Sequence, residues 1–246
     1  MRLLAVILAL ASVVPATPLL AQEAATISYE QVETGADAFV TGGERLVHPG
    51  GNDVEIGESQ FWQVGPAPIP AGIAAYGPFR VIDGRHVALI DATDSRSPQQ
   101  FAALLRDYPA ISEIEMIECP GTEDDLANLR LGRMIRERGI ATHVPTGGSV
   151  RSGGVELFLA GVQRYADPGS EFAVHSWIDD SGREAGDYAA DAPENRRYLD
   201  YYRQMGMSMG EAQAFYAMTN AVPFESAHWF GAEEMGRWIR LDHVES

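Results

Sequence analysis

GGSVRSGGVELFLAGVQRYADPGSEFAVHSW, residues 147–177, is the most informative stretch of this chain. It places Ser152 in a glycine-rich turn at the start of an apolar helix, and His175 in the alternating strand 171–177 that follows. A hydroxyl at such a turn lies beside free backbone N–H groups and the positive end of the helix dipole, which stabilise an oxyanion. Ser152 is therefore the candidate nucleophile, and His175 is the candidate base that takes its proton.

The residues around this stretch alternate between strand-like and helix-like patterns. The pattern predicts strands at 80–82, 86–91, 114–118 and 141–145, and helices at 98–107, 123–138, 194–205 and 208–219. Alternation of this kind implies an α/β fold with a largely parallel sheet covered by helices. Tyrosines on the last two helices are best explained by core packing or a subunit contact.

The predicted helix 123–138 begins and ends at clear signals. Thr122 is the expected N-cap, Asp125 stands at the capping-box position, and Gly139 ends the helix. Gly121 lies just before, at the carboxyl end of a strand, where α/β proteins place ligands. Without a side chain, Gly121 lets a substrate carbonyl approach its backbone closely.

The charged residues exclude several kinds of chemistry. All 18 Lys+Arg residues are arginine, so the chain has no amine for a serine/lysine dyad, a Schiff base or a phosphate-binding loop. The formal net charge of −17 disfavours binding to nucleic acid, which needs a basic face. The histidines lack ligand spacing, so we expect neither a metal nor a cofactor.

The first 21 residues have the features of a secretory signal: one early cation, Arg2, then an apolar run and small residues before Gln22. We expect cleavage near Ala21 and an exported, periplasmic protein with no membrane span after cleavage. Cys119 is the single cysteine, so no internal disulfide forms. Residues 22–78 are a Gly- and Pro-rich segment to which we assign no function, and residues 79–246 form the α/β domain.

The order of motifs from Phe79 to Asp242 resembles the Clp protease proteolytic subunit and the wider crotonase superfamily. The motifs, in order, are CPG at 119–121, RERG at 136–139, SGG at 152–154, LAG at 159–161, AVH at 173–175 and WFGAEEMGRWI at 229–239. The signal and the PFESAHW stretch at 223–229 are similar to a group of exported bacterial proteins with this fold. The resemblance implies a spiral of repeated strand-strand-helix (ββα) units.

The same resemblance implies roles for individual residues. It makes Ser152 the nucleophile and His175 the general base, with the N–H groups of Gly121 and Gly153 as the oxyanion hole. The family's orienting aspartate matches Ala227 here. Glu225 is our choice for the third member of the triad because its longer side chain reaches further.

Several alternatives stay open at this stage. Asp179 and Asp180 are rivals of Glu225, since they follow His175 closely; without any of them the site is a dyad or inactive. Glu156, one helical turn after Ser152, is unexpected at a buried position.

Three functions fit the sequence to different degrees. The first is an exported serine hydrolase, a peptidase acting on a peptide or ester, for which a homo-oligomer is the candidate assembly. The second is a catalytically inactive binding or scaffold module, which the alanine at 227 favours. The third, a crotonase-like enzyme acting on an acyl thioester, is disfavoured by the predicted export and by the absence of lysine.

Overall fold

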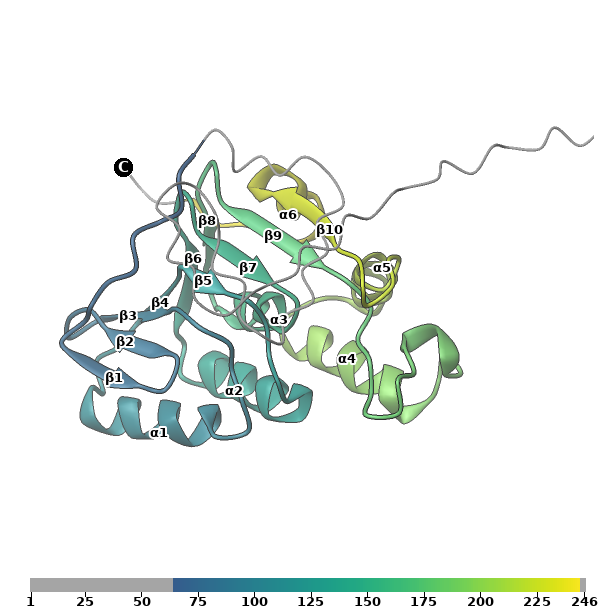
Figure 1. The fold of residues 1–246 in the computed structure, drawn as a ribbon, viewed down its shortest axis with the longest axis horizontal. Coiled ribbons are helices and arrows are strands. Elements are labelled where there is room, and N and C mark those ends of the chain that lie inside the picture. Colours follow the sequence, from purple (N-terminus) through teal and green to yellow (C-terminus); the bar gives the residue numbers. More distant parts are fainter. Residues whose placement is uncertain (1–63, 244–246) are drawn as a thin grey trace, which may run out of the picture. The chain divides into compact units, whose positions relative to one another are not determined.

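A computed structural model describes residues 64–243 of the chain (Figure 1). The predicted signal at 1–21 and nearly all of the segment 22–78 up to residue 63 lie outside the described residues. The elements are β1 Ala74–Tyr76, β2 Phe79–Val81, β3 His86–Leu89, α1 Ser97–Asp107, β4 Glu113–Met116, β5 Glu118–Cys119, α2 Asp125–Glu137, β6 Ala141–Val144, β7 Ser149–Arg151, α3 Gly153–Ala160, β8 Arg164–Ala166, β9 Glu171–Val174, the short 3₁₀ turn η2 Ala185–Asp187, α4 Pro193–Gln204, α5 Met209–Thr219, β10 His228–Gly231 and α6 Ala232–Trp238.

The middle of the chain repeats one unit, in which two strands are followed by a helix. The units β4-β5-α2, β6-β7-α3 and β8-β9-α4 each contribute one strand to a six-stranded sheet and one to a four-stranded sheet. The strand orders are β1-β2-β3-β4-β6-β8 and β10-β9-β7-β5, and every pair between successive units is parallel. The predicted α/β class, largely parallel sheet and ββα spiral are confirmed. β1, at the end of the segment 22–78, pairs antiparallel with β2.

Helix α3 lies at the centre of the packing. All of its residues are buried, and it packs against α2 and against strands β6, β7 and β9. A helix that is apolar on all sides must be covered on all sides, which explains this position. The ring of Phe158 on α3 contacts Phe172 on β9 at 5.0 Å between centroids, and Phe172 stacks on Phe230 of β10. The core therefore holds the segment after Ser152 rigidly between two layers.

The start of α2 differs from the prediction. Asp124, and not Thr122, is the N-cap: its carboxylate accepts a hydrogen bond from the Ala127 N–H at 2.9 Å. The Thr122 hydroxyl instead donates to the Thr93 carbonyl at 3.2 Å, because this segment forms a bridge with Thr93 before the helix begins. The predicted end is confirmed, since Gly139 adopts φ +66° directly after the cap.

The strand that carries the candidate base is shorter than predicted. β9 ends at Val174, so His175 lies one residue beyond the strand's carboxyl end. β10 pairs antiparallel with β9 and places His228 opposite Val174. The two tyrosine-bearing helices are present as α4 and α5, and Tyr198, Tyr201 and Tyr202 of α4 are buried, in agreement with core packing. No helix within residues 64–243 is long and apolar enough to cross a membrane.

Candidate active site

Ser152 has the most unusual backbone in the described part of the chain. It is the only non-glycine residue within 64–243 with a positive φ, and its angles are φ 47° and ψ −127°. It forms the sharp turn between β7 and α3, while its N–H donates to the Ala173 carbonyl at 2.9 Å and its carbonyl accepts from Val155 at 2.8 Å. Such conformations cost about 1–3 kcal/mol and concentrate at functional sites, including the strand-to-helix turns that present nucleophilic serines.

Three glycines make room for this turn. A Cβ on Gly121 would lie 3.1 Å from the Ser152 Cβ, and Gly121 has φ +131°. A Cβ on Gly153 would lie 2.6 Å from the Thr122 Cγ2, and one on Gly154 would lie 3.0 Å from the Cys119 carbonyl oxygen. The absence of side chains therefore lets the end of β5 pass directly against the start of α3, which brings the Gly121 backbone beside the Ser152 side chain.

The two peptides predicted to form the oxyanion hole are anchored through their carbonyl groups. The Gly121 carbonyl accepts from the Thr93 N–H at 3.1 Å, and the Gly153 carbonyl accepts from the Asn128 side chain at 2.7 Å. The Thr93 hydroxyl in turn donates to the Asn128 Oδ1 at 2.9 Å. Neither the Gly121 nor the Gly153 N–H donates to an acceptor among residues 64–243. Both donors are thus held in place and unused.

Sequence reasoning missed Thr93 and Asn128, which are both buried. Thr93 gives no local signal, because it lies in a loop far from the serine turn in sequence. Asn128 gives one signal: it occupies the buried face of α2 together with Leu131 and Ile135, at helical spacing. A polar residue in an apolar stripe needs a buried partner, and here that partner is the peptide next to the candidate nucleophile.

His175 is oriented by the backbone. Its Nδ1 lies 2.8 Å from the Ser176 carbonyl oxygen, and its ring meets the Phe224 ring edge-on at 5.0 Å. Since a carbonyl oxygen only accepts, Nδ1 carries the hydrogen and Nε2 keeps the free lone pair of the neutral ring. Ser176 is itself fixed, because its N–H donates to the Val222 carbonyl at 2.9 Å.

Ser152, Gly153 and His175 line one pocket. No hydrogen bond joins the Ser152 hydroxyl to the His175 ring in this structure, as is common for catalytic pairs before substrate binds. Gly121 is placed beside Ser152 by the contact its Cβ would make. The fold therefore brings the four residues predicted for nucleophile, base and oxyanion hole to one neighbourhood.

The carboxylates predicted as third members lie elsewhere. Glu225 is exposed in the turn between α5 and β10. Asp179 accepts from Tyr188 and Ser181 within its own loop, and these bonds hold the pKa of its carboxyl well below the usual range. Asp180 is exposed. Among residues 64–243 no carboxylate hydrogen-bonds the His175 ring, and the Ser176 carbonyl occupies that place.

The remaining pocket wall combines acidic and aromatic side chains from α2, α3, α4 and α5. The cavity has a volume of about 40 Å³ and opens to solvent. Glu156 accepts from the Tyr202 hydroxyl at 2.8 Å, and burial raises the pKa of its carboxyl to about 7. Asp125 accepts from the Tyr198 hydroxyl at 2.7 Å, and burial raises the pKa of that carboxyl as well. The other lining residues are Val174, Trp177, Tyr216, Thr219 and Asn220.

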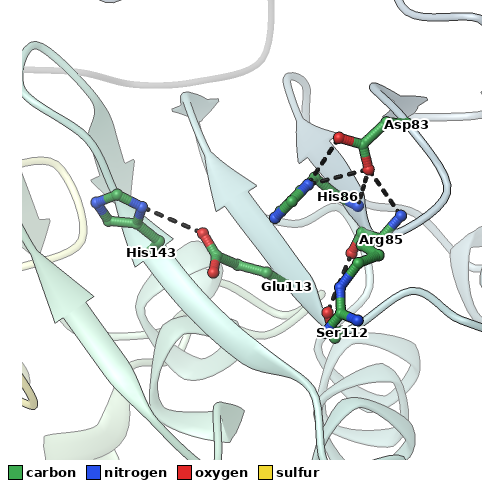
Figure 2. A network of polar contacts seen from close by, with 6 residues as sticks. All are labelled: Asp83, Arg85, His86, Ser112, Glu113 and His143. Carbon is green, nitrogen blue, oxygen red and sulfur yellow. Dashed lines mark hydrogen bonds and ion pairs between the residues drawn. The ribbon is translucent and has the colours of Figure 1, made fainter. Parts of the chain in front are cut away.

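A second polar cluster, here called the sheet cluster, lies at strands β3, β4 and β6 of the six-stranded sheet (Figure 2). Its members are Asp83, His86, Glu113, His143 and Asp167, and none of them lines the pocket. His86 Nδ1 is 2.8 Å from Asp83 Oδ2. The His143 ring lies between two carboxylates, with Nδ1 3.3 Å from Glu113 Oε1 and Nε2 3.1 Å from Asp167 Oδ1. The hydrogen bond with Glu113 raises the pKa of His143.

Other reactive groups do not form a site. Cys119 is fully buried, which raises the pKa of its thiol well above the usual range and keeps it unreactive, in agreement with its prediction as a small buried residue. Within residues 64–243 no group of three or more His, Cys, Asp or Glu side chains is arranged to hold a metal ion.

Solved structures resemble this chain, whereas protein families and curated proteins give no match. Among solved structures, the chain is similar to the membrane-bound stomatin-specific protease 1510-N, solved as a mutant in complex with a substrate peptide. The identity is 17%, the match covers 63% of this chain and 72% of that one, and the TM-score is 0.43. A likeness of that size carries no argument about the site, so the function rests on the geometry described above.

Proposed function

We propose that this chain is an exported serine hydrolase that cleaves peptide bonds through an acyl-enzyme at Ser152. The observation that carries the proposal is the strained backbone of Ser152, held at a strand-to-helix turn beside a pocket that His175 also lines. Strain of about 1–3 kcal/mol persists only where the surrounding structure enforces it, and a half-buried serine at the edge of a pocket gives no packing reason to maintain it.

In the proposed reaction, the Ser152 Oγ attacks the carbonyl carbon of the substrate while His175 Nε2 accepts the hydroxyl proton. The carbonyl oxygen becomes an oxyanion and accepts hydrogen bonds from the Gly121 and Gly153 N–H groups. The imidazolium then gives its proton to the leaving amine as the C–N bond breaks. A water molecule, activated by the same ring, attacks the acyl carbon and releases Ser152.

The lack of a carboxylate on the His175 ring among residues 64–243 has a physical consequence. The Ser176 carbonyl fixes the tautomer and orientation of His175, which are two of the tasks of a triad aspartate. It stabilises the imidazolium less than a full negative charge does. Asp125 supplies part of that charge, since it interacts electrostatically with His175 across the pocket. We therefore propose a dyad with a backbone-oriented histidine, with Glu225 left as a surface carboxylate.

A catalytically inactive binding module is the second candidate. It is favoured by Ala227, which stands where the resembling family has its aspartate, and by the lack of a carboxylate on the His175 ring among the described residues. Such a module would keep the pocket and the fold while Ser152 remains unactivated.

Labelling with a fluorophosphonate probe separates the two candidates, because only an activated serine reacts. We expect the wild-type protein to be labelled, and the modified peptide to contain Ser152. Ser152→Ala removes labelling, whereas Ser181→Ala, a control at an exposed serine, keeps it. Labelling that persists in Ser152→Ala would move the nucleophile elsewhere, and an unlabelled wild type would favour the binding module.

Export and partners complete the proposal. Residues 1–21 direct secretion to the periplasm, the mature chain acts on peptides without a cofactor or nucleic acid, and copies assemble into a homo-oligomer. Expression of the full chain in a Gram-negative host tests the first point, since the secreted protein should begin at Gln22. Light scattering of that mature protein tests the last.

A further inference from the structure

Every polar hydrogen that the pocket's aromatic side chains can donate is already used within the protein. Tyr198 donates to Asp125 and Tyr202 to Glu156. Tyr216 donates to Asn195 Oδ1 at 2.6 Å, and the Trp177 indole N–H donates to the Tyr216 oxygen at 2.7 Å. The pocket therefore has no spare aromatic donor for a ligand.

Acceptors, by contrast, remain in excess. Tyr198 is the only side-chain donor to Asp125 within residues 64–243, and Tyr202 is the only one to Glu156. Each carboxylate has two oxygens and about four acceptor positions, so one phenol leaves most of that capacity unused. The pocket thus offers carboxylate oxygens with spare acceptor positions, although the Glu156 carboxylate also accepts from its own backbone N–H.

Asn220 adds an independent observation. Its Nδ2 donates to the Tyr216 carbonyl at 2.8 Å, which fixes the orientation of the amide. Its Oδ1 is then shielded from water with no donor among the described residues. A buried acceptor without a donor costs about 1–3 kcal/mol, so a water molecule or a ligand is expected to supply the donor. A bound ligand with N–H groups is a partner of the required kind.

The pocket also lacks a cation of its own. Apart from His175, no basic side chain lines it. Arg197 lies over the rings of Trp177 and Tyr198 at 5.3 and 5.2 Å; its charge acts on Asp125, but among the described residues it hydrogen-bonds neither pocket carboxylate. Burial without a paired cation raises the pKa of both Asp125 and Glu156, so a positive charge entering the pocket would be stabilised.

We propose that this pocket binds the cationic side chain of an arginine or lysine residue, the residue whose carbonyl Ser152 attacks. The placement follows from the lining, since the acyl group of the intermediate is bonded to Ser152 and its side chain extends toward Glu156, one helical turn along α3. The acidic groups of Asp125 and Glu156 take the N–H donors of that side chain. As a statement about specificity, this inference rests on the proposed function.

Two phosphonate probes test the specificity directly. Peptidyl diphenyl phosphonates that differ only in arginine or its neutral isostere citrulline at the reacting position are compared by their rates of reaction with the mature protein. We expect the arginine probe to react about tenfold faster or more, as charge-assisted hydrogen bonds allow. Equal rates, or a preference for citrulline, would overturn the inference while leaving Ser152 as the nucleophile.

Variants locate the effect within the pocket. Asp125→Asn and Glu156→Gln keep the shapes of the side chains and remove their negative charge, so the arginine-to-citrulline rate ratio should fall in each and approach one in the double variant. Glu137→Gln removes one charge from the exposed end of α2 and should keep the wild-type ratio. A ratio that stays high in the double variant would also overturn the inference.

A binding measurement separates specificity from catalysis. Arginine amide and citrulline amide are titrated calorimetrically into Ser152→Ala, which cannot form an acyl-enzyme. We expect arginine amide to bind about tenfold more tightly. If the wild type reacts with neither phosphonate but this preference holds, the hydrolase proposal fails and the cation site stands. If neither amide binds, or if both bind with equal affinity, the cation site fails.

Discussion

The pocket beside Ser152 and the sheet cluster both contain histidines and carboxyl groups, but the pKa values of the carboxyl groups shift in opposite directions. In the sheet cluster each histidine faces a carboxylate, and the hydrogen bonds with histidine lower the pKa of Asp83 to about 2 and lower that of Glu113 (Figure 2). In the pocket no cation among the described residues hydrogen-bonds the carboxyls, and burial raises the pKa of Asp125 and Glu156. A satisfied cluster stabilises the fold, whereas an unsatisfied one is available to a ligand.

The two histidines that differ most in this respect are His175 and His143. His143 is held between Glu113 and Asp167, so both of its nitrogens face carboxylates. His175 has one nitrogen on a backbone carbonyl and lines the pocket with Ser152. Pairing with acidic partners makes His143 a structural residue, and a free Nε2 makes His175 suited to accept a proton.

The largest expected effect is on the labelling rate of Ser152 when each of these histidines is replaced in turn. His175→Gln should lower the rate of fluorophosphonate labelling of Ser152 by about 10²–10⁴-fold, the usual contribution of a general base. His143→Gln should leave that rate within about twofold, because it acts only on the sheet cluster. Labelling kinetics followed by intact-mass spectrometry measure both. Slow labelling of the His143→Gln variant together with normal labelling of His175→Gln would reverse the roles given to the two histidines.

A second expected effect is the pH dependence of stability, which comes from burial of a carboxyl in the pocket and from an acidic partner of a histidine in the sheet cluster. The folded pKa of Glu156, about 7, lies above the ordinary value of 4.5, so the folded state keeps a proton that the unfolded chain releases. This group therefore destabilises the fold progressively as pH rises from about 4.5 to 7, by up to about 3 kcal/mol. Glu156→Gln removes the loss, so its stability relative to wild type should rise across that window and then level off.

The sheet cluster should show a slope of the same sign for its histidine, because the pKa of His143 is also raised in the folded state. The pKa of His143 is raised by Glu113, so its stabilising contribution is present at pH values below the ordinary histidine range and fades as pH rises through the folded pKa. Urea unfolding of wild type, Glu156→Gln and His143→Gln between pH 5 and 8 measures both trends. A flat difference for Glu156→Gln would show that its carboxyl is ionised throughout and that the pocket is better solvated than the structure indicates.

The smallest expected effect is the Glu113–His143 pair itself. Both side chains are partly exposed, at 26% and 20%, so solvent screens their attraction. Glu113→Gln should lower the free energy of unfolding at pH 6 by about 0.5–1 kcal/mol, and a double-mutant cycle with His143→Gln isolates the coupling. A coupling energy of zero would mean that Asp167 alone accounts for the state of the ring.

The sequence indicated more of the fold than of the site. The alternation of patterns predicted the α/β class and most elements within a few residues, because helical and strand periodicities are local properties. The N-cap of α2 was wrong, since Thr122 and Asp124 are both good caps and only the long-range bridge to Thr93 selects between them. Likewise, β9 ends one residue before His175 because β10 covers it only to Val174.

For the site, the serine turn and the histidine could be chosen from sequence because glycine-rich turns and short polar motifs are local signals. The group that orients His175 could not be chosen, since a backbone carbonyl has no signature in the sequence. Glu225, Asp179 and Asp180 were all candidates by their positions along the chain. Glu156 was noticed as unexpected, but its meaning depends on Tyr202, which lies 46 residues further along the chain.

The amino-acid sequence alone determined the alternating α/β pattern, the absence of lysine chemistry and the glycines that a strained serine turn requires, because these depend on residue type and short spacing. Only the tertiary structure decided which distant groups surround that serine. The strain at Ser152, the carbonyl on His175 and the acceptors left without donors arise where α2, α3, α4 and α5 meet, and burial there changes the free energy of every charge.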